Sequence, residues 1–205
     1  MKKLILILVL LANCHLAVSQ DGMRSSVKAG VTYILFGSGD LSGLNYYNEY
    51  NRSINRFLTF APSLHIGYGS KSTLISSSGM TEGLRFTKAS VALDANLFFS
   101  PMRFERSKVR LGVGPSLRFL SDSHPSSFGV SYQGPSPNLP PGNDYVLNPF
   151  VYTNPQNYLT VGYTVILEGE LNAGPRWIAG ARASFQNYAS GETAANIGVN
   201  VGYRF

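Results

Sequence analysis

The sequence predicts an all-β chain that folds as an eight-stranded antiparallel transmembrane β-barrel. Apolar and polar residues alternate through most of the chain, and a period of two is typical of strands. Only 14% of the 205 residues are charged, while 12 Tyr, 12 Phe and 21 Gly favour strands and tight turns over helices. An export signal at the N-terminus provides the third observation. Together these observations indicate a secreted β chain with an unusually apolar surface.

The export signal has three parts. They are the basic pair Lys2 and Lys3, the apolar run 4–12 and the small-residue site 17–19. This order is typical of a secretory signal peptide. We expect cleavage after Ser19, which gives a signal peptide at 1–19 and one barrel domain at 20–205. The apolar run is too short for a helical anchor, because spanning a bilayer needs ~20 apolar residues.

Cys14, the only cysteine, offers a competing interpretation of the N-terminus. A lipoprotein signal would carry its lipid on Cys14, although Asn13 fits poorly before a lipidated cysteine. If cleavage follows Ser19, the mature chain has no cysteine, and we expect neither disulfides nor thiol chemistry. Loss of Lys2 and Lys3 lowers the 17 basic residues to 15, against 11 acidic residues. This small excess gives no reason to expect a nucleic-acid partner.

The alternating segments define the strands in order. Seven are plain from their period of two, at 25–36, 56–69, 85–99, 108–120, 158–172, 176–188 and 194–205. A membrane barrel with both chain ends on one side needs an even number of strands. We therefore place the missing strand at 72–78, after a tight turn at 69–71.

This assignment separates short turns from long loops. Short inner turns are expected near 69–72, 100–107 and 173–175. Outer loops are expected at 37–55, 79–84, 121–157 and 189–193. Short turns at one end and longer loops at the other are typical of exported barrels.

The face opposite the apolar stripes distinguishes a membrane barrel from a soluble sandwich. In a membrane barrel the apolar face contacts lipid, and the opposite face lines the lumen with polar and charged side chains. Aromatic residues near the strand ends would form the interfacial belts. These are Tyr33, Tyr68, Phe99, Phe119, Tyr163, Trp177, Phe185 and Tyr203. The export signal and these belts favour the membrane barrel.

Charged residues on the polar face predict a lumen charge network. Its members are Lys28, Lys88, Asp94, Arg110, Arg118, Glu168, Glu170, Arg182 and Arg204. Eight strands enclose an interior just wide enough for side chains to fill, and charges there must pair or stay hydrated. A hairpin that turns near Gly174 would place Arg182 diagonally across from Glu168. We expect a salt-bridged plug; a narrow, gated, anion-preferring channel is the alternative.

The last ten residues, NIGVNVGYRF, form a strand that ends on an aromatic ring. Ile197, Val199, Val201, Tyr203 and Phe205 occupy alternate positions. This pattern resembles the assembly signal of bacterial outer-membrane β-barrel proteins. The whole plan resembles small eight-stranded barrels of the OmpA and OmpX type, within the broad outer membrane protein beta-barrel domain family. No peptidoglycan-binding domain follows the last strand, so the likeness to OmpA covers its barrel only.

The resemblance implies several properties of this chain. It implies an integral protein of the outer membrane of a Gram-negative bacterium, in contact with the lipid of that membrane. It also implies that the barrel-assembly machinery recognises the C-terminal strand, and it leaves room for an outer-membrane protein partner.

Some small outer-membrane barrels modify lipid A with a His, a Ser and an acid, which makes an enzyme the competing class. Ser63 and His65 share one inward face and superficially suggest a nucleophile with its base. Such a pair would face the lumen rather than lipid, and Gly67 stands where a Ser would follow the His. His124 lies in a loop context, and two isolated histidines make no metal cluster. We expect no enzymatic activity, no cofactor and no metal site.

The expected loop 121–157 contains seven of the eleven prolines. Its aromatic residues are candidates for loop recognition: Phe128, Tyr132, Tyr145, Phe150 and Tyr152. Prolines lower the entropy cost of ordering, and aromatic rings provide contact area. The expected loop 37–55 adds Tyr46, Tyr47 and Tyr50. Two interpretations stay open, a structural or partner-binding role through these loops or a loop that only caps the barrel mouth.

Overall fold

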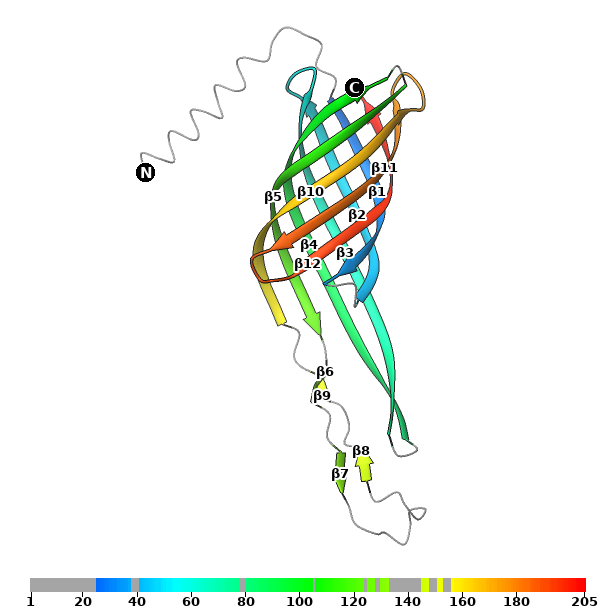
Figure 1. The fold of residues 1–205 in the computed structure, drawn as a ribbon, viewed down its shortest axis with the longest axis vertical. Coiled ribbons are helices and arrows are strands. Elements are labelled where there is room, and N and C mark those ends of the chain that lie inside the picture. Colours follow the sequence, from blue (N-terminus) through cyan, green and yellow to red (C-terminus); the bar gives the residue numbers. More distant parts are fainter. Residues whose placement is uncertain are drawn as a thin grey trace, which may run out of the picture.

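Eight antiparallel strands close into one barrel (Figure 1). The computed structural model describes residues 25–37, 41–77, 80–104, 106–123, 125–127, 130–132, 145–147, 151–152 and 156–205. The barrel strands are β1 (Ser25–Phe36), β2 (Leu41–Ser53), β3 (Leu58–Ser77), β4 (Met80–Arg103), β5 (Ser107–Ser123), β10 (Gln156–Asn172), β11 (Trp177–Tyr188) and β12 (Thr193–Arg204). Each pairs with its neighbours along the chain, and β1 pairs with β12 to close the barrel. The predicted fold class is confirmed.

Two short ladders lie between β5 and β10 in the sequence. β6 (Pro125–Ser127) pairs with β9 (Val151–Tyr152), and β7 (Val130–Tyr132) pairs with β8 (Tyr145–Leu147). Figure 1 shows them beyond one end of the barrel. The described residues include no helix that is long and apolar enough to cross a membrane.

The second strand of the barrel lies where the sequence analysis expected the loop 37–55, so that expectation was wrong. β2 pairs with β1 along its whole length and with β3 on its other edge. Aromatic residues stand on both of its faces, outward at Tyr46 and inward at Tyr47, which blurs the alternation. The connection from β1 begins at Gly37, whose φ of 65° lies in the left-handed region that favours glycine.

The expected strand at 72–78 is the continuation of β3, and the expected turn at 69–71 does not exist. The ladder between β3 and β4 runs without a break from Leu58–Phe99 to Ser77–Met80. The loop expected at 79–84 is therefore also wrong, because β4 begins at Met80. Gly69, Ser70 and Lys71 suggest a turn. This part of β3 instead pairs with β4 beyond the end of the barrel, where both faces of the strand pair can be polar. The total of eight strands is right because one strand was missed and another was divided.

The connections separate into two ends, as the sequence predicts. The connections 54–57, 104–106 and 173–176 lie at one end, together with Ser25 and Phe205 (Figure 1). We name this the turn end and the opposite end the loop end. The inner turn expected near 69–72 is replaced by the turn at 54–57. The longest connection leaves from the loop end, between β5 and β10.

Side chains alternate between the lumen and the outer surface along most of each barrel strand, with a register shift in β4 between Phe99 and Met102. Outward residues are exposed and apolar: Val31 is 49% exposed, Leu93 57% and Val199 66%. Inward residues are buried and mostly polar. A close approach fixes the packing at Gly30, where an added Cβ would lie 2.5 Å from the ring of Tyr47. The polar core and the apolar surface are the reverse of a soluble protein.

Candidate functional site

Six charged side chains gather inside the barrel toward the turn end. They are Lys28 on β1, Glu49 on β2, Arg110 on β5, Glu168 and Glu170 on β10 and Arg182 on β11, and we name them the lumen charge cluster. Each is at most 2% exposed. Strand register brings them to one level, because Lys28 is paired with Glu49, and Glu168 with both Arg110 and Arg182. Five strands thus direct charges to one place.

Glu168 is the shared acceptor of this cluster. Nε of Arg182 donates to Oε2 of Glu168 at 2.7 Å, and Nη2 of Arg110 donates to Oε1 at 3.0 Å. Nζ of Lys28 donates to the same Oε1 at 2.5 Å. Three cations from three strands therefore converge on one fully buried carboxylate.

The other two carboxylates complete the network. Glu49 accepts from Nη2 of Arg182 at 2.5 Å and from Nη2 of Arg110 at 3.2 Å. Glu170 pairs with Lys28, with Nε of Arg110 at 2.8 Å and with Nζ of Lys108 at 2.8 Å. Three buried cations thus face three buried anions, with Lys108 at the edge of the cluster.

Aromatic rings fill the space around the guanidinium groups. Cζ of Arg110 lies 4.0 Å from the centroid of the Phe98 ring, and Cζ of Arg182 lies 4.4 Å from that of Tyr47. Both distances are within the range of cation–π contacts. Phe98 also packs with Ala61 and Ile166 in a small apolar core. The cluster is therefore packed as well as paired.

Glu49 is the member of the cluster that the sequence analysis missed. It lies on β2, which was expected to be a loop. The alternation of Asn45, Glu49 and Asn51 with Leu44 and Tyr46 could have shown its inward position. Its presence removes part of the cation excess from which an anion-preferring channel was inferred.

A second polar group surrounds Asp94 farther along the lumen. Oγ of Ser116 donates to Oδ1 of Asp94 at 2.5 Å, and Gln186 donates to Oδ2 at 3.3 Å. Nε2 of His65 lies 3.3 Å from Oδ2 of Asp94 and 3.1 Å from Oγ of Ser63. All five side chains are buried.

Ser63, His65 and Asp94 do not form a proton relay. A Ser–His–Asp relay needs the acid on one ring nitrogen of the histidine and the serine on the other. Here both contact Nε2, while Nδ1 of His65 lies 3.3 Å from Nδ2 of Asn45. An outward groove of about 710 Å³ lies beside these strands, with Leu64, Leu93 and Leu117 among its lining residues. Ser63, Asp94 and Ser116 also line this groove, so it is the missing contact to Nδ1 of His65, and not burial, that separates the three residues from a relay.

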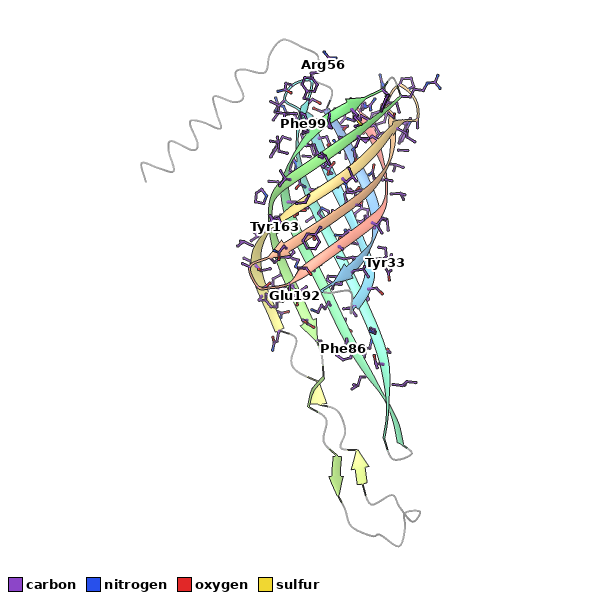
Figure 2. The ribbon with its side chains drawn as sticks, in the orientation of Figure 1. Tyr33, Arg56, Phe86, Phe99, Tyr163 and Glu192 are labelled. Atoms are coloured by element: carbon purple, nitrogen blue, oxygen red, sulfur yellow. The ribbon has the colours of Figure 1, made fainter. Side chains whose placement is uncertain are left out.

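A third layer of side chains lies at the loop end of the lumen. Nζ of Lys88 donates to Glu192 at 2.8 Å and pairs with Asp122 at 3.1 Å. Arg118 is 1% exposed and stacks 3.9 Å above the ring of Tyr188. Figure 2 shows Glu192 at this level of the barrel. Beside them lies an apolar seal made of Ile34, Phe36, Leu41, Leu120 and Ala194, with Phe86 and Tyr158 packed against it.

The remaining predicted residues lie elsewhere. Arg204 is half-buried at the turn end, where Nη2 donates to Oδ1 of Asn172, so it is not a member of the lumen charge cluster. In the expected assembly strand, Ile197, Val199, Val201 and Phe205 are exposed and Tyr203 contacts Trp177.

Several residues of the predicted sites lie outside the part of the chain that the structure describes. Phe128 and Phe150 lie outside the described residues, as do the expected signal peptide 1–19 and Cys14. Tyr132, Tyr145 and Tyr152 are placed on β7, β8 and β9, but their side chains are not described. Among the described residues, no group of three or more His, Cys, Asp or Glu side chains could hold a metal ion.

The barrel fold, with its apolar outer face and its polar inner face, defines the class of this protein. A closed barrel of eight antiparallel strands, apolar outside and polar inside, is the architecture of transmembrane β-barrels. No family model and no curated protein sequence matches this chain.

Solved structures confirm the resemblance to small bacterial outer-membrane barrels. Ail, the attachment invasion locus protein of Yersinia pestis, is 12% identical with a TM-score of 0.53, over 89% of this chain and 99% of Ail. A major outer membrane protein from Thermus thermophilus is 13% identical with a TM-score of 0.53, over 90% and 100%. Neisserial surface protein A is 13% identical with a TM-score of 0.50, over 90% and 98%. At such identities the shared feature is the fold.

Proposed function

We propose that this chain is an integral outer-membrane protein whose filled barrel is a rigid scaffold, and whose loop end binds an outer-membrane or external protein partner. The observation that carries the proposal is the filled lumen. The lumen charge cluster, the group around Asp94 and the apolar seal occupy successive levels. Fold alone does not determine function. Because the lumen is filled, we expect the functional surface at the loop end of the barrel, outside the membrane.

The ribbon of β3 and β4 supports a role for the loop end. Pairing of β3 with β2 ends at Gly43–Gly69, and pairing of β4 with β5 ends at Thr87–Ser123. The two strands continue as a free ribbon to Ser77 and Met80, roughly 25 Å at the usual rise per residue. Figure 1 shows this ribbon beyond the barrel, on the same side as β7 and β8. Exposed ribbon edges are templates for a partner strand.

The aromatic residues of the long connection are the proposed contact residues. They are Phe128, Tyr132, Tyr145, Phe150 and Tyr152. Ail was crystallised with the heparin analogue sucrose octasulfate, so a sulfated glycan is an alternative ligand to include in the assay. Activity on lipid A remains the less favoured alternative, and a mass shift of lipid A on expression would reveal it.

Deletion of 127–150 tests this proposal. The junction joins β6 to β9, which already pair at Pro125 and Tyr152, so the barrel should assemble. We expect the shortened protein to fractionate with outer membranes and to lose the partners that the full chain retains after cross-linking and pull-down from the native envelope.

Two controls make the result decisive. A chain without Phe205 should assemble more slowly, as expected if the assembly machinery recognises the last strand, and thereby calibrates the assembly assay. A full-length variant with serine at the five aromatic positions keeps the loop length and should also lose the partners. An assembled deletion variant that retains every partner contradicts the recognition role.

A further inference from the structure

Arginines surround the turn end of the barrel. Each of the three turns there carries one within two residues of the next strand: Arg56, Arg106 and Arg176. Arg52 near the end of β2 and Arg204 at the end of β12 lie at the same end. We name these five residues the arginine rim.

The strand order distributes the arginine rim around the barrel. Arg52 is paired with Ser25 at the start of β1, and Arg56 joins β2 to β3. Arg106 joins β4 to β5, and its carbonyl accepts from the amide of Asn172 on β10 at 2.7 Å. Arg176 precedes β11, and its carbonyl accepts from the amide of Arg204 on β12 at 2.8 Å. Every sector of this end therefore holds an arginine or adjoins one.

Acidic groups do not balance the arginine rim from outside. The described carboxylates nearest to this end, Glu49, Glu168 and Glu170, are buried and paired within the lumen charge cluster. Asp122 and Glu192 lie at the loop end. In the sequence of the three turns, Glu105 is the one acidic residue, and it lies outside the described residues. The side chains described at this end outside the lumen therefore carry an excess of positive charge, opposed by the C-terminal carboxylate of Phe205.

Exposed aromatic rings lie directly beside the arginines. Cζ of Arg56 lies 5.6 Å from the centroid of the Phe57 ring, which contacts Phe99 at 6.3 Å; Figure 2 labels Arg56 and Phe99 at this end. Nη1 of Arg176 donates to the Tyr203 hydroxyl at 2.9 Å, and the Tyr203 ring meets Trp177 edge-on at 5.4 Å. Tyr and Trp mark the membrane–water interface, so the arginines lie at the level of the lipid headgroups.

We propose that the arginine rim binds the phosphate groups of anionic phospholipids in the leaflet at the turn end, and so fixes the depth of the barrel in the bilayer. Guanidinium groups bind phosphate oxygens in bidentate fashion, and the neighbouring rings place them at headgroup level. Those rings favour lipid over an anionic cell-wall glycan, which would lie beyond the bilayer. The inference rests on the proposed membrane location.

Trp177 provides a local reporter, because it is the only tryptophan of the chain and is 57% exposed. The full chain is reconstituted in phosphatidylcholine vesicles that contain brominated lipid as a minor component. In one sample the brominated lipid is phosphatidylglycerol, and in the other it is phosphatidylcholine at the same mole fraction. Bromine quenches only lipid-adjacent tryptophan, so the ratio of quenching reports which lipid is enriched beside Trp177.

We expect wild-type enrichment of phosphatidylglycerol on the order of fivefold, the effect of about one arginine near an anionic surface. The Arg106→Gln/Arg176→Gln variant removes the two arginines beside the turn end of β10 and should reduce the ratio toward one. Arg176→Lys keeps the charge beside the reporter but loses the bidentate contact, and should therefore retain only part of the enrichment. Higher ionic strength should lower the wild-type ratio.

The matched control is Lys71→Gln/Arg85→Gln, which removes the same charge from the ribbon of β3 and β4 at the loop end. Its ratio should equal that of the wild type. Equal quenching by the two lipids in the wild type, or equal ratios in the wild type and Arg106→Gln/Arg176→Gln, would overturn the inference. So would a control variant that loses enrichment equally, because net charge would then be the cause.

Membrane insertion and lipid enrichment are tested separately. Membrane insertion is measured first, by flotation with the vesicles and the heat-dependent gel shift of a folded barrel. Failure at that step overturns the proposed membrane location itself, whereas insertion without enrichment overturns only the arginine rim. Co-sedimentation with peptidoglycan that Arg106→Gln/Arg176→Gln alone loses, with an unchanged lipid ratio, would assign the arginines to the cell wall instead.

Discussion

Glu168 shows how a single residue organises the interior. It accepts from Lys28, Arg110 and Arg182, which come from three different strands. Buried charges are costly to remove from water, and they are tolerated only when paired and hydrogen-bonded. The cost of disturbing such a group is therefore much larger than the net stabilisation that the group contributes.

Substitution of Glu168 by Gln should destabilise the folded barrel strongly. The amide keeps the shape but leaves three cations facing two carboxylates, and removal of one partner from a buried ion pair costs about 3–5 kcal/mol. The measurement is the urea midpoint of the barrel refolded in lipid vesicles.

The control for Glu168→Gln is Glu192→Gln. The side chain of Glu192 is 21% exposed and lies 2.8 Å from Nζ of Lys88 and 3.9 Å from Nη2 of Arg118 near the mouth, where water can replace it. A loss of less than about 1 kcal/mol is expected there. Equal midpoints for the two variants would show that the lumen charge cluster is hydrated and not a closed network.

The residue scale also shows what the sequence could not specify. The pairing of Arg182 with Glu168 follows from the hairpin between β10 and β11. The sequence predicted a diagonal contact, and the structure pairs the two residues directly. The contribution of Glu49 depends on β2, a strand distant from both in the sequence. A nonlocal contact of this kind has no local sequence signal.

At the scale of the element, β12 is the strand that closes the barrel. It pairs with β11 on one edge and with β1 on the other, from Phe36–Ala194 to Ser26–Arg204. The two ends of the described chain are thereby joined along one ladder. Its alternation was visible in the sequence and closure required it to pair with the first strand, but the register of that pairing was not visible.

Gly198→Ala should weaken this closing ladder. A Cβ at Gly198 would lie 2.1 Å from the carbonyl oxygen of Val31 and 2.5 Å from Cα of Thr32. Both are backbone atoms, so β1 and β12 would have to separate, with a loss of about 1–3 kcal/mol in the free energy of unfolding. Heat-dependent mobility on gels reports the change.

Gly169→Ala is the matched substitution for Gly198→Ala. An added Cβ at Gly169, also within a barrel strand, meets nothing within 4 Å. Its effect should stay within about 0.5 kcal/mol. A barrel in which both variants melt alike would contradict the tight approach of β1 and β12.

For the whole molecule, the successive layers in the lumen predict a closed barrel. Eight strands leave an interior that side chains can fill, and here the lumen charge cluster and the apolar seal fill it at two levels. We expect no resolved current steps from the purified protein in planar bilayers. Phe36→Ala, which opens only the apolar seal, should also remain silent because the charge cluster lies below it.

Current in the planar bilayer would discriminate between the two interpretations of the lumen. Steady anion-selective steps from the wild type would restore the channel interpretation. Steps from Phe36→Ala alone would assign the closure to the apolar seal. A silent wild type and a silent variant are the results that a filled scaffold requires.

The sequence by itself determined the class of fold, because the period of two and the apolar outer stripe are local properties of consecutive residues. It also determined which residues of most strands face inward, including Lys28, Arg110 and Glu168. The even strand count followed from closure, a rule that holds for any such barrel. It did not depend on placing every strand correctly.

Only the tertiary structure decided which strand was missing and how the charges balance. β2 carries aromatic residues on both faces, which obscured the alternation of its polar and apolar residues until the structure placed it between β1 and β3. Glu49 lies on that strand, and together with Glu168 and Glu170 it balances the three cations of the cluster. Strand register is fixed by hydrogen bonds between segments distant in the sequence, and this is the physical reason why the network is a property of the closed barrel.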